Sequence, residues 1–170
     1  SVGEEESGTE KNAEQILAAY GLSERLVTEV NLDYTDAVEQ LKKKEIDAMF
    51  CTAGAYTTVI GELAKQCEIR FIDLDEKGID KLMKSYDFYT ECEIPENTYV
   101  GQTEAVRTVG VKAVLLASDK LSEKKVKEIT EILFENKAEL QYILPTDISL
   151  DESQATEGIT IPFHDGAAVY

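Results

Sequence analysis

The residues best suited to chemistry lie near the start of the chain, where Ser7, Gly8 and Thr9 follow a turn. Their order predicts the N-terminus of a helix, at which the first backbone N–H groups have no acceptor within the helix. Those groups, with two hydroxyls beside them, can bind a carboxylate or a phosphate. The same residues fit a capping box, with Ser7 as the N-cap and Glu10 reaching back. Anion binding and simple helix capping are therefore both open for this turn.

A second turn of small and hydroxyl residues follows at 51–57, where Thr52 and Tyr56 flank Gly54. Like the first, it comes directly after an apolar segment that is typical of a strand. Ligands of open α/β sheets bind at the carboxyl ends of strands, so two such turns favour a small-molecule cleft. The glutamates at positions 4–6 would repel an anion if they pointed inward, and we expect them to face solvent.

The chain shows no catalytic constellation and no metal-binding spacing. One histidine, His164, cannot build a zinc site, and none of the three cysteines lies in a CxxC motif. We therefore predict no metal, no cofactor and no enzymatic activity. A nucleophilic pair of Cys51 and His164 is conceivable, but a loop histidine bonded to backbone is the favoured interpretation. Three reduced cysteines are favoured over one disulfide and one free thiol.

Composition limits the function classes. The chain has 170 residues, is 43% hydrophobic and carries a net charge of −17. That length suffices for one hydrophobic core. The acidic balance argues against nucleic acid and anionic membrane surfaces as partners. No apolar run approaches the roughly 20 residues of a membrane span, and no signal peptide is recognisable.

Hydrophobic periodicity predicts helices that alternate with short strands over the first half of the chain. Apolar residues recur at helical spacing within 13–20, 37–41, 59–64 and 79–86, and strands are expected at 26–32, 46–51 and 69–74. Thr35 is the expected cap of the second helix. This alternation predicts an α/β fold with a mainly parallel sheet that is covered on both faces.

The pattern changes after about residue 88. Turn formers fill 87–108, and a nearly continuous apolar run follows at 109–117. A helix is expected from Ser122 to about Leu140, and a short acidic helix near 151–157. This last part has no strand partner of its own, so we expect it to pack on something else.

Several segments resemble the TAXI-family solute receptors of TRAP transporters. The similarity runs from one end of the chain to the other, through motifs in the order in which that family has them. They are Gly3 with Ser7-Gly8-Thr9, residues 47–50, Ile94-Pro95 with Thr98-Tyr99 and Gly101-Gln102, residues 106–113, residues 133–136, and Ile161-Pro162 with His164 and Gly166-Ala167.

The resemblance implies a type II periplasmic-binding-protein fold, of which this chain holds one lobe and the C-terminal segment that packs on the other. Residues 1–104 would form the second lobe, with helices on both faces of its sheet. Residues 105–118 would be a crossover strand, and 119–170 a helical segment belonging to a first lobe that is missing here. The implied function is extracytoplasmic binding of a small carboxylate, an amino acid or a dicarboxylate, for delivery to membrane permease subunits. As a fragment, the chain should be impaired in binding.

The resemblance also implies the roles of particular residues. Ser7, Gly8 and Thr9 would donate to the solute carboxylate, Thr52 and Tyr56 would line the wall, and Tyr99 and Gln102 would lie near the hinge. The implied location is the periplasm or the extracellular surface.

Two departures from the family bear on binding. The chain has Gly54-Ala55-Tyr56 where the family has a proline after the glycine, so Tyr56 could close or reshape the pocket. The glutamates at 4–6 replace a less charged loop. The alternative function is a stand-alone α/β module that binds proteins or associates with itself through an apolar face, without a small ligand.

Overall fold

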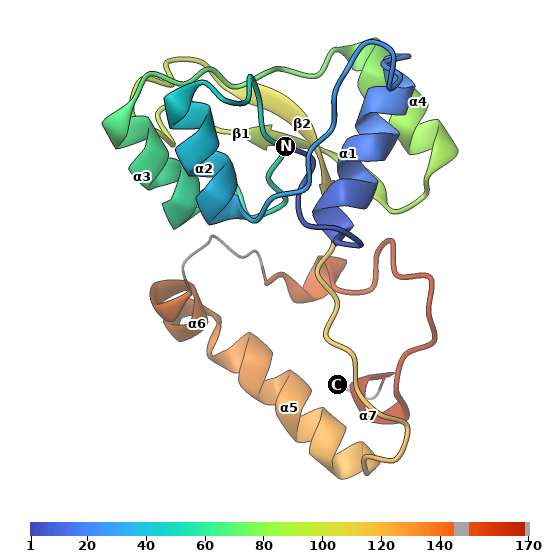
Figure 1. The fold of residues 1–170 in the computed structure, drawn as a ribbon. Coiled ribbons are helices and arrows are strands. Elements are labelled where there is room, and N and C mark those ends of the chain that lie inside the picture. Colours follow the sequence, from blue (N-terminus) through green and yellow to red (C-terminus); the bar gives the residue numbers. More distant parts are fainter. Residues whose placement is uncertain (145–149, 169–170) are drawn as a thin grey trace.

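A computed structural model describes residues 1–144 and 150–168, which form a body and an arm (Figure 1). The body, residues 1–111, holds α1 (Gly8–Ala19), α2 (Tyr34–Lys43), α3 (Thr58–Gln66), α4 (Glu76–Ser85), β1 (Tyr89–Ile94) and β2 (Val106–Val111). The arm, residues 112–144 and 150–168, holds α5 (Glu123–Glu135), α6 (Lys137–Ile143), a 3₁₀ turn (Glu152–Gln154) and α7 (Asp165–Ala168). Figure 1 shows the arm extending away from the body at the end of β2.

The α/β class is confirmed, but the mainly parallel sheet is not what forms. The assigned sheet pairs β1 with β2 in the antiparallel sense, with Tyr89 opposite Val111 and Ile94 opposite Val106. Of the strands expected at 26–32, 46–51 and 69–74, none is assigned as a strand.

The reason lies in the short central segment of the body. Residues 1–3 lie between 30–32 and 48–50 and bond to both in the parallel sense, but the chain turns at Gly3. Three residues offer too few peptide groups for a continuous ladder on either side. The bonds are Ser1 N to Ala48 O (2.6 Å), Phe50 N to Ser1 O (2.9 Å), Val2 N to Val30 O (3.1 Å) and Leu32 N to Gly3 O (3.2 Å).

Two helix boundaries differ from expectation because local side chains decide them. The cap of α2 is Asp33, whose carboxylate accepts from Asp36 N at 2.8 Å, and Thr35 lies inside the first turn. The helix expected from Ser122 to about Leu140 begins as predicted, but it breaks at Asn136 into α5 and α6. There the Asn136 side chain donates to Ile132 O at 2.8 Å and competes for a helix carbonyl.

The apolar run at 109–117 is only partly a strand. β2 ends at Val111, and the exposed fractions of Val114, Leu115 and Leu116 rise to 46%, 67% and 73%. Among the described residues no backbone hydrogen bond is recorded for 112–117. The expected acidic helix near 151–157 is a single 3₁₀ turn, capped by Asp151.

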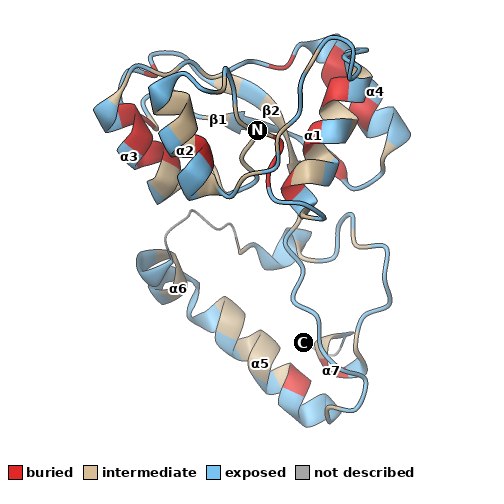
Figure 2. Ribbon diagram, viewed as in Figure 1, coloured by how far each residue is buried: buried red, intermediate tan, exposed pale blue. Residues whose placement is uncertain are grey.

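Burial is concentrated in the body, as Figure 2 shows. One cluster joins α4 to β1 through Ile79, Leu82 and Tyr89, and another holds the start of the chain against α1. In the described part of the arm only Val126 and Gly166 are buried, where α5 crosses α7. The arm therefore has almost no core of its own. No helix in the described residues is long and apolar enough to span a bilayer.

Neighbouring residues of α4 provide a test of this packing. Leu82 is 1% exposed and Met83 is 40% exposed. Leu82→Ala should lower the free energy of unfolding by about 2–5 kcal/mol, because it leaves a cavity in the α4–β1 cluster. Met83→Ala should cost less than about 1 kcal/mol. Urea unfolding followed by circular dichroism measures both, and equal losses would contradict this assignment of the core.

Candidate functional site

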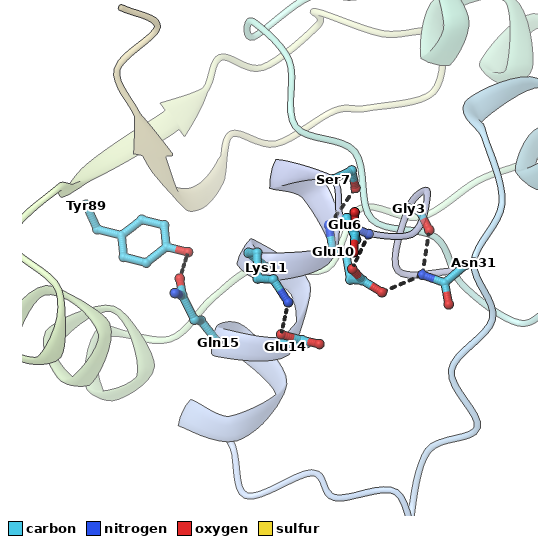
Figure 3. Close-up of polar contacts among 9 residues, drawn as sticks. All are labelled: Gly3, Glu6, Ser7, Glu10, Lys11, Glu14, Gln15, Asn31 and Tyr89. Atoms are coloured by element: carbon cyan, nitrogen blue, oxygen red, sulfur yellow. Dashed lines mark hydrogen bonds and ion pairs between the residues drawn. The ribbon is translucent and has the colours of Figure 1, made fainter.

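The start of α1 is held by a network around Ser7 and Glu10 (Figure 3). Ser7 Oγ accepts from Glu10 N at 3.1 Å, which confirms the capping interpretation. The Glu10 carboxylate accepts from Glu6 N at 2.7 Å and from Asn31 Nδ2 at 2.6 Å. The Ser7 hydroxyl is therefore used to cap α1, and the Glu10 carboxylate faces the turn before this helix. Glu4, Glu5 and Glu6 are exposed, as expected.

The next two backbone N–H groups, those of Gly8 and Thr9, are the first of the helix and have no acceptor within it. No other acceptor is recorded for them among the described residues. Both residues line a pocket of about 520 Å³ between the body and the arm. That volume lies within the range of small-molecule sites.

We call this cavity the arm–body pocket. α1 and the turn at Thr52 form one wall, and the arm forms the other. The lining residues are Gly8, Thr9, Lys11, Asn12, Gln15, Thr52, Phe88, Val111, Lys112, Val114, Gly158, Ile159, Thr160 and Ile161.

Two of the three threonines that line the pocket, Thr9 and Thr52, share a partner that sequence reasoning missed. The Tyr34 hydroxyl lies 2.8 Å from Thr9 Oγ1, and it accepts from Thr52 N at 3.0 Å. Asn12 Nδ2 also donates to Thr52 Oγ1 at 3.2 Å. Thr9 and Thr52 are therefore brought together, as the two-turn interpretation requires. Burial raises the pKa of Tyr34, so its hydroxyl keeps its proton at neutral pH.

Two lining residues of α1, Asn12 and Gln15, are held from β1 by Tyr89. Tyr89 is 4% exposed, and its hydroxyl donates to Gln15 Oε1 at 2.6 Å (Figure 3). Burial raises the pKa of Tyr89 to about 12, so this donor stays protonated at any physiological pH. The middle of α1 thereby keeps a fixed position relative to the sheet.

Two lysines give the pocket positive charge in an otherwise acidic chain. Lys11 lies on α1 with its Nζ 3.4 Å from Glu14. Lys112 lies on the arm, where its Nζ donates to Gln154 O at 2.7 Å and lies 4.0 Å from Glu157. Neither stands out in the sequence, because each is a single lysine and only the fold brings the two to one cavity.

Gly3 lets the turn before α1 lie against Thr9, in the pocket wall that α1 forms. Its φ is +100°, and a Cβ there would lie 2.8 Å from Thr9 Cβ. Asn31 Nδ2 also donates to Gly3 O at 3.1 Å. Only glycine permits this approach of the turn to Thr9.

The other expected site residues do not line the arm–body pocket. Tyr99 is buried beside α3, where its hydroxyl donates to Ala55 O and accepts from Thr57 N, both at 2.9 Å. Its ring stacks on Tyr56 and on Phe71, with centroids 5.5 and 5.0 Å away. Tyr56 and Tyr99 thus fix the turn that precedes α3.

Gln102 is buried in the loop that joins β1 to β2. Its side-chain amide donates to Pro95 O at 3.0 Å and to Glu104 O at 3.1 Å. Its carbonyl accepts from Tyr99 N at 3.2 Å. These contacts hold the loop closed.

The hydrolase alternative gains no support from Cys51 and His164. Burial raises the pKa of the Cys51 thiol, which lowers its thiolate fraction. His164 accepts from Gly166 N at 3.0 Å through Nδ1, so Nε2 carries the proton and donates to Leu121 O at 3.2 Å. This confirms a loop histidine bonded to backbone. All three cysteines are free thiols, and the described residues contain no cluster of three potential metal ligands.

The structure is a mixed α/β fold with a pocket of ligand size at the start of α1. Residues 1–170 match the NMT1-like family, and the chain belongs to that family. It is related to periplasmic solute-binding proteins, a class that binds rather than transforms its ligands and typically works outside the cytoplasm.

The contact between Gly3 and Thr9 can be tested by substitution. Gly3→Ala and Gly101→Ala both force alanine into a left-handed conformation, at a cost of about 1–2 kcal/mol. Gly101 has open space around it, whereas at Gly3 the new methyl group meets Thr9. Gly3→Ala should therefore lower the free energy of unfolding by about 1–3 kcal/mol more than Gly101→Ala. Urea unfolding measures both, and equal losses would show that the approach to Thr9 is not tight.

Proposed function

We propose that this protein is a TAXI-type solute receptor of a TRAP transporter, which binds a small carboxylate in the arm–body pocket and delivers it to permease subunits. The membership in the NMT1-like family supports a solute-binding role. The observation that carries the proposal is that Gly8 and Thr9, the first residues of α1, line a ligand-sized pocket.

The strength of such a site comes from several donors together. One helix N-terminus contributes about 0.3–1 kcal/mol to anion binding, or about 2 kcal/mol when partly buried. Lys11 on the body and Lys112 on the arm add charge from opposite walls. Binding therefore requires donors from both the body and the arm.

Within this proposal the expected site residues have two kinds of role. Gly8, Thr9 and Thr52 contact the solute, and Ser7 holds the helix end that presents them. Tyr56, Tyr99 and Gln102 act indirectly, by fixing the turn before α3 and the loop between β1 and β2. Residues 1–104 correspond to the second lobe, 105–118 to the crossover, and 119–170 to the segment that packs on a first lobe.

Calorimetry with L-glutamate, succinate and the neutral analogue succinamide tests the proposal. At least one carboxylate should bind better than the amide, and Thr9→Ala should weaken it about tenfold or more, as the loss of a hydrogen bond to a charged group does. Thr130→Ala is the matched control, because this threonine bonds to Val126 O within α5, away from the pocket. If no acid binds and Thr9→Ala changes nothing, the proposal is wrong.

A second function, self-association, is favoured by the exposed surface. The accessible surface is 11910 Å², whereas a compact monomer of 18.9 kDa exposes about 8300 Å². The excess of roughly 3600 Å² per chain is ample for an obligate interface, which buries about 2000–5000 Å² over both partners together. Body and arm also enclose an open groove of about 3160 Å³, far larger than a small solute needs.

Leu116 and Val100 distinguish this function from solute binding. Both are exposed, at 73% and 63%, but only Leu116 lines the groove. If the groove joins two copies, sedimentation should show a dimer that Leu116→Asp dissociates and Val100→Asp does not. The dimer should tighten with added salt, because each copy carries −17 charges that repel at low ionic strength. A monomer at every concentration and salt would exclude this function.

A further inference from the structure

Behind the pocket wall, the Tyr34 hydroxyl connects Thr9 and Thr52. Tyr34 begins α2 and is not among the lining residues, but its oxygen lies 2.8 Å from Thr9 Oγ1. It also lies 3.0 Å from Thr52 N and 3.2 Å from Thr52 O. The Cys51 thiol bonds to it as well, so the hydroxyl has four neighbours for one hydrogen and two lone pairs.

The position of the Tyr34 hydrogen decides what Thr9 can do. Thr52 N–H donates to the Tyr34 oxygen, so the Tyr34 hydrogen goes to Thr9 Oγ1, to Thr52 O or to the Cys51 sulfur. If it goes to Thr52 O or to Cys51, Thr9 must donate its own hydrogen to Tyr34 and has none for the pocket. If it goes to Thr9, the Thr9 hydrogen is free to point at a solute.

We propose that Tyr34 is a positioning residue that makes Thr9 a hydrogen-bond donor to a carboxylate in the arm–body pocket. The inference rests on the proposed function, since it requires an anion there. A carboxylate accepts hydrogen bonds and offers none, so its arrival selects the arrangement in which Tyr34 donates to Thr9 and Thr9 donates to the solute.

Two features of the geometry favour this arrangement. The contact with Thr9 is shorter than the contact with Thr52 O, 2.8 Å against 3.2 Å, and 2.8 Å is the usual O–H···O distance. A chain of hydroxyls that ends on an anion is also polarised along its length, which strengthens each bond. Because burial raises its pKa, Tyr34 keeps the hydrogen that the chain needs.

Tyr20 is a matched control for Tyr34. Its hydroxyl also accepts from a backbone N–H, that of Asp75, at 3.0 Å, and it donates to Asp75 Oδ1 at 2.9 Å. It lies at the far end of α1 and does not line the arm–body pocket. Tyr20→Phe and Tyr34→Phe thus remove the same atom and similar hydrogen bonds, one away from the pocket and one behind it.

The experiment titrates succinate against the amide signals of Gly8 and Thr9 by NMR, in the whole chain and its variants. Tyr34→Phe should weaken binding about tenfold, and Thr9→Val by at least as much. The double variant should match Thr9→Val within about twofold, because both changes remove the same donor. Tyr20→Phe should leave binding unchanged within about twofold while costing similar stability.

The failures of the two ideas are distinguishable. If wild type binds succinate but Tyr34→Phe binds it equally well, Tyr34 does not position Thr9, and the solute site stands. If the two single effects add in the double variant, Tyr34 acts independently of Thr9 and the proposal is overturned. If succinate shifts neither the Gly8 nor the Thr9 signal in the wild type, the carboxylate site and this role of Tyr34 are both wrong.

Discussion

The approach of Gly3 to Thr9 is the contact on which the candidate site depends. A left-handed glycine lets the chain turn back within a few residues, so that Ser7 caps a helix directly behind the segment 1–3. That segment is itself fixed on both sides by backbone bonds to 30–32 and 48–50. The N-terminus of α1, the turn at Thr52 and the start of α2 therefore lie close together. Residues 1–3 precede α1, and they bond to residues 30–32, which precede α2, and to residues 48–50, which precede Thr52.

The energetics of the two parts differ accordingly. The body has several small buried clusters, and each helix in it covers one of them or packs on its neighbour. The described part of the arm buries only Val126 and Gly166. Because apolar burial contributes about 25 cal/mol per Å², the arm gains little from its own packing. Both proposed functions would supply what the arm lacks: a solute that joins it to the body, or a protein surface that covers it.

Sequence reasoning succeeded where the interaction is local. Ser7 and Glu10 are three residues apart, and a capping box is a short-range pattern. Thr9 and Thr52, each expected at a turn after an apolar segment, do lie beside one pocket, but their contact with a solute stays a prediction. The prediction of a mainly parallel sheet was wrong. Periodicity identifies extended segments, but it does not show whether the central segment, here residues 1–3, is long enough to pair with its neighbours.

The sequence could not indicate Tyr34 or the two pocket lysines, because only the fold brings them to the pocket. Tyr34 is 25 residues from Thr9, and no spacing rule links a helix-starting tyrosine to a distant threonine. Tyr99 and Gln102 show the converse: their motif is distinctive, but the structure uses both side chains to hold the loop and the turn before α3. A motif identifies residues that matter to a fold without saying whether they touch a ligand.

The net charge of the protein limits how the pocket could attract an anionic solute. With −17 charges on the chain, the long-range field repels an anionic solute, so attraction has to come from groups within a few ångströms. Salt screens that repulsion, with a Debye length of about 8 Å. It screens interactions inside a partly enclosed pocket much less. Fixed dipoles are suited to this situation, since the Gly8 and Thr9 amides and a hydroxyl chain add no long-range charge. An acidic receptor for an acidic solute would thus depend on the placement of neutral donors more than on its lysines, each of which lies near a glutamate.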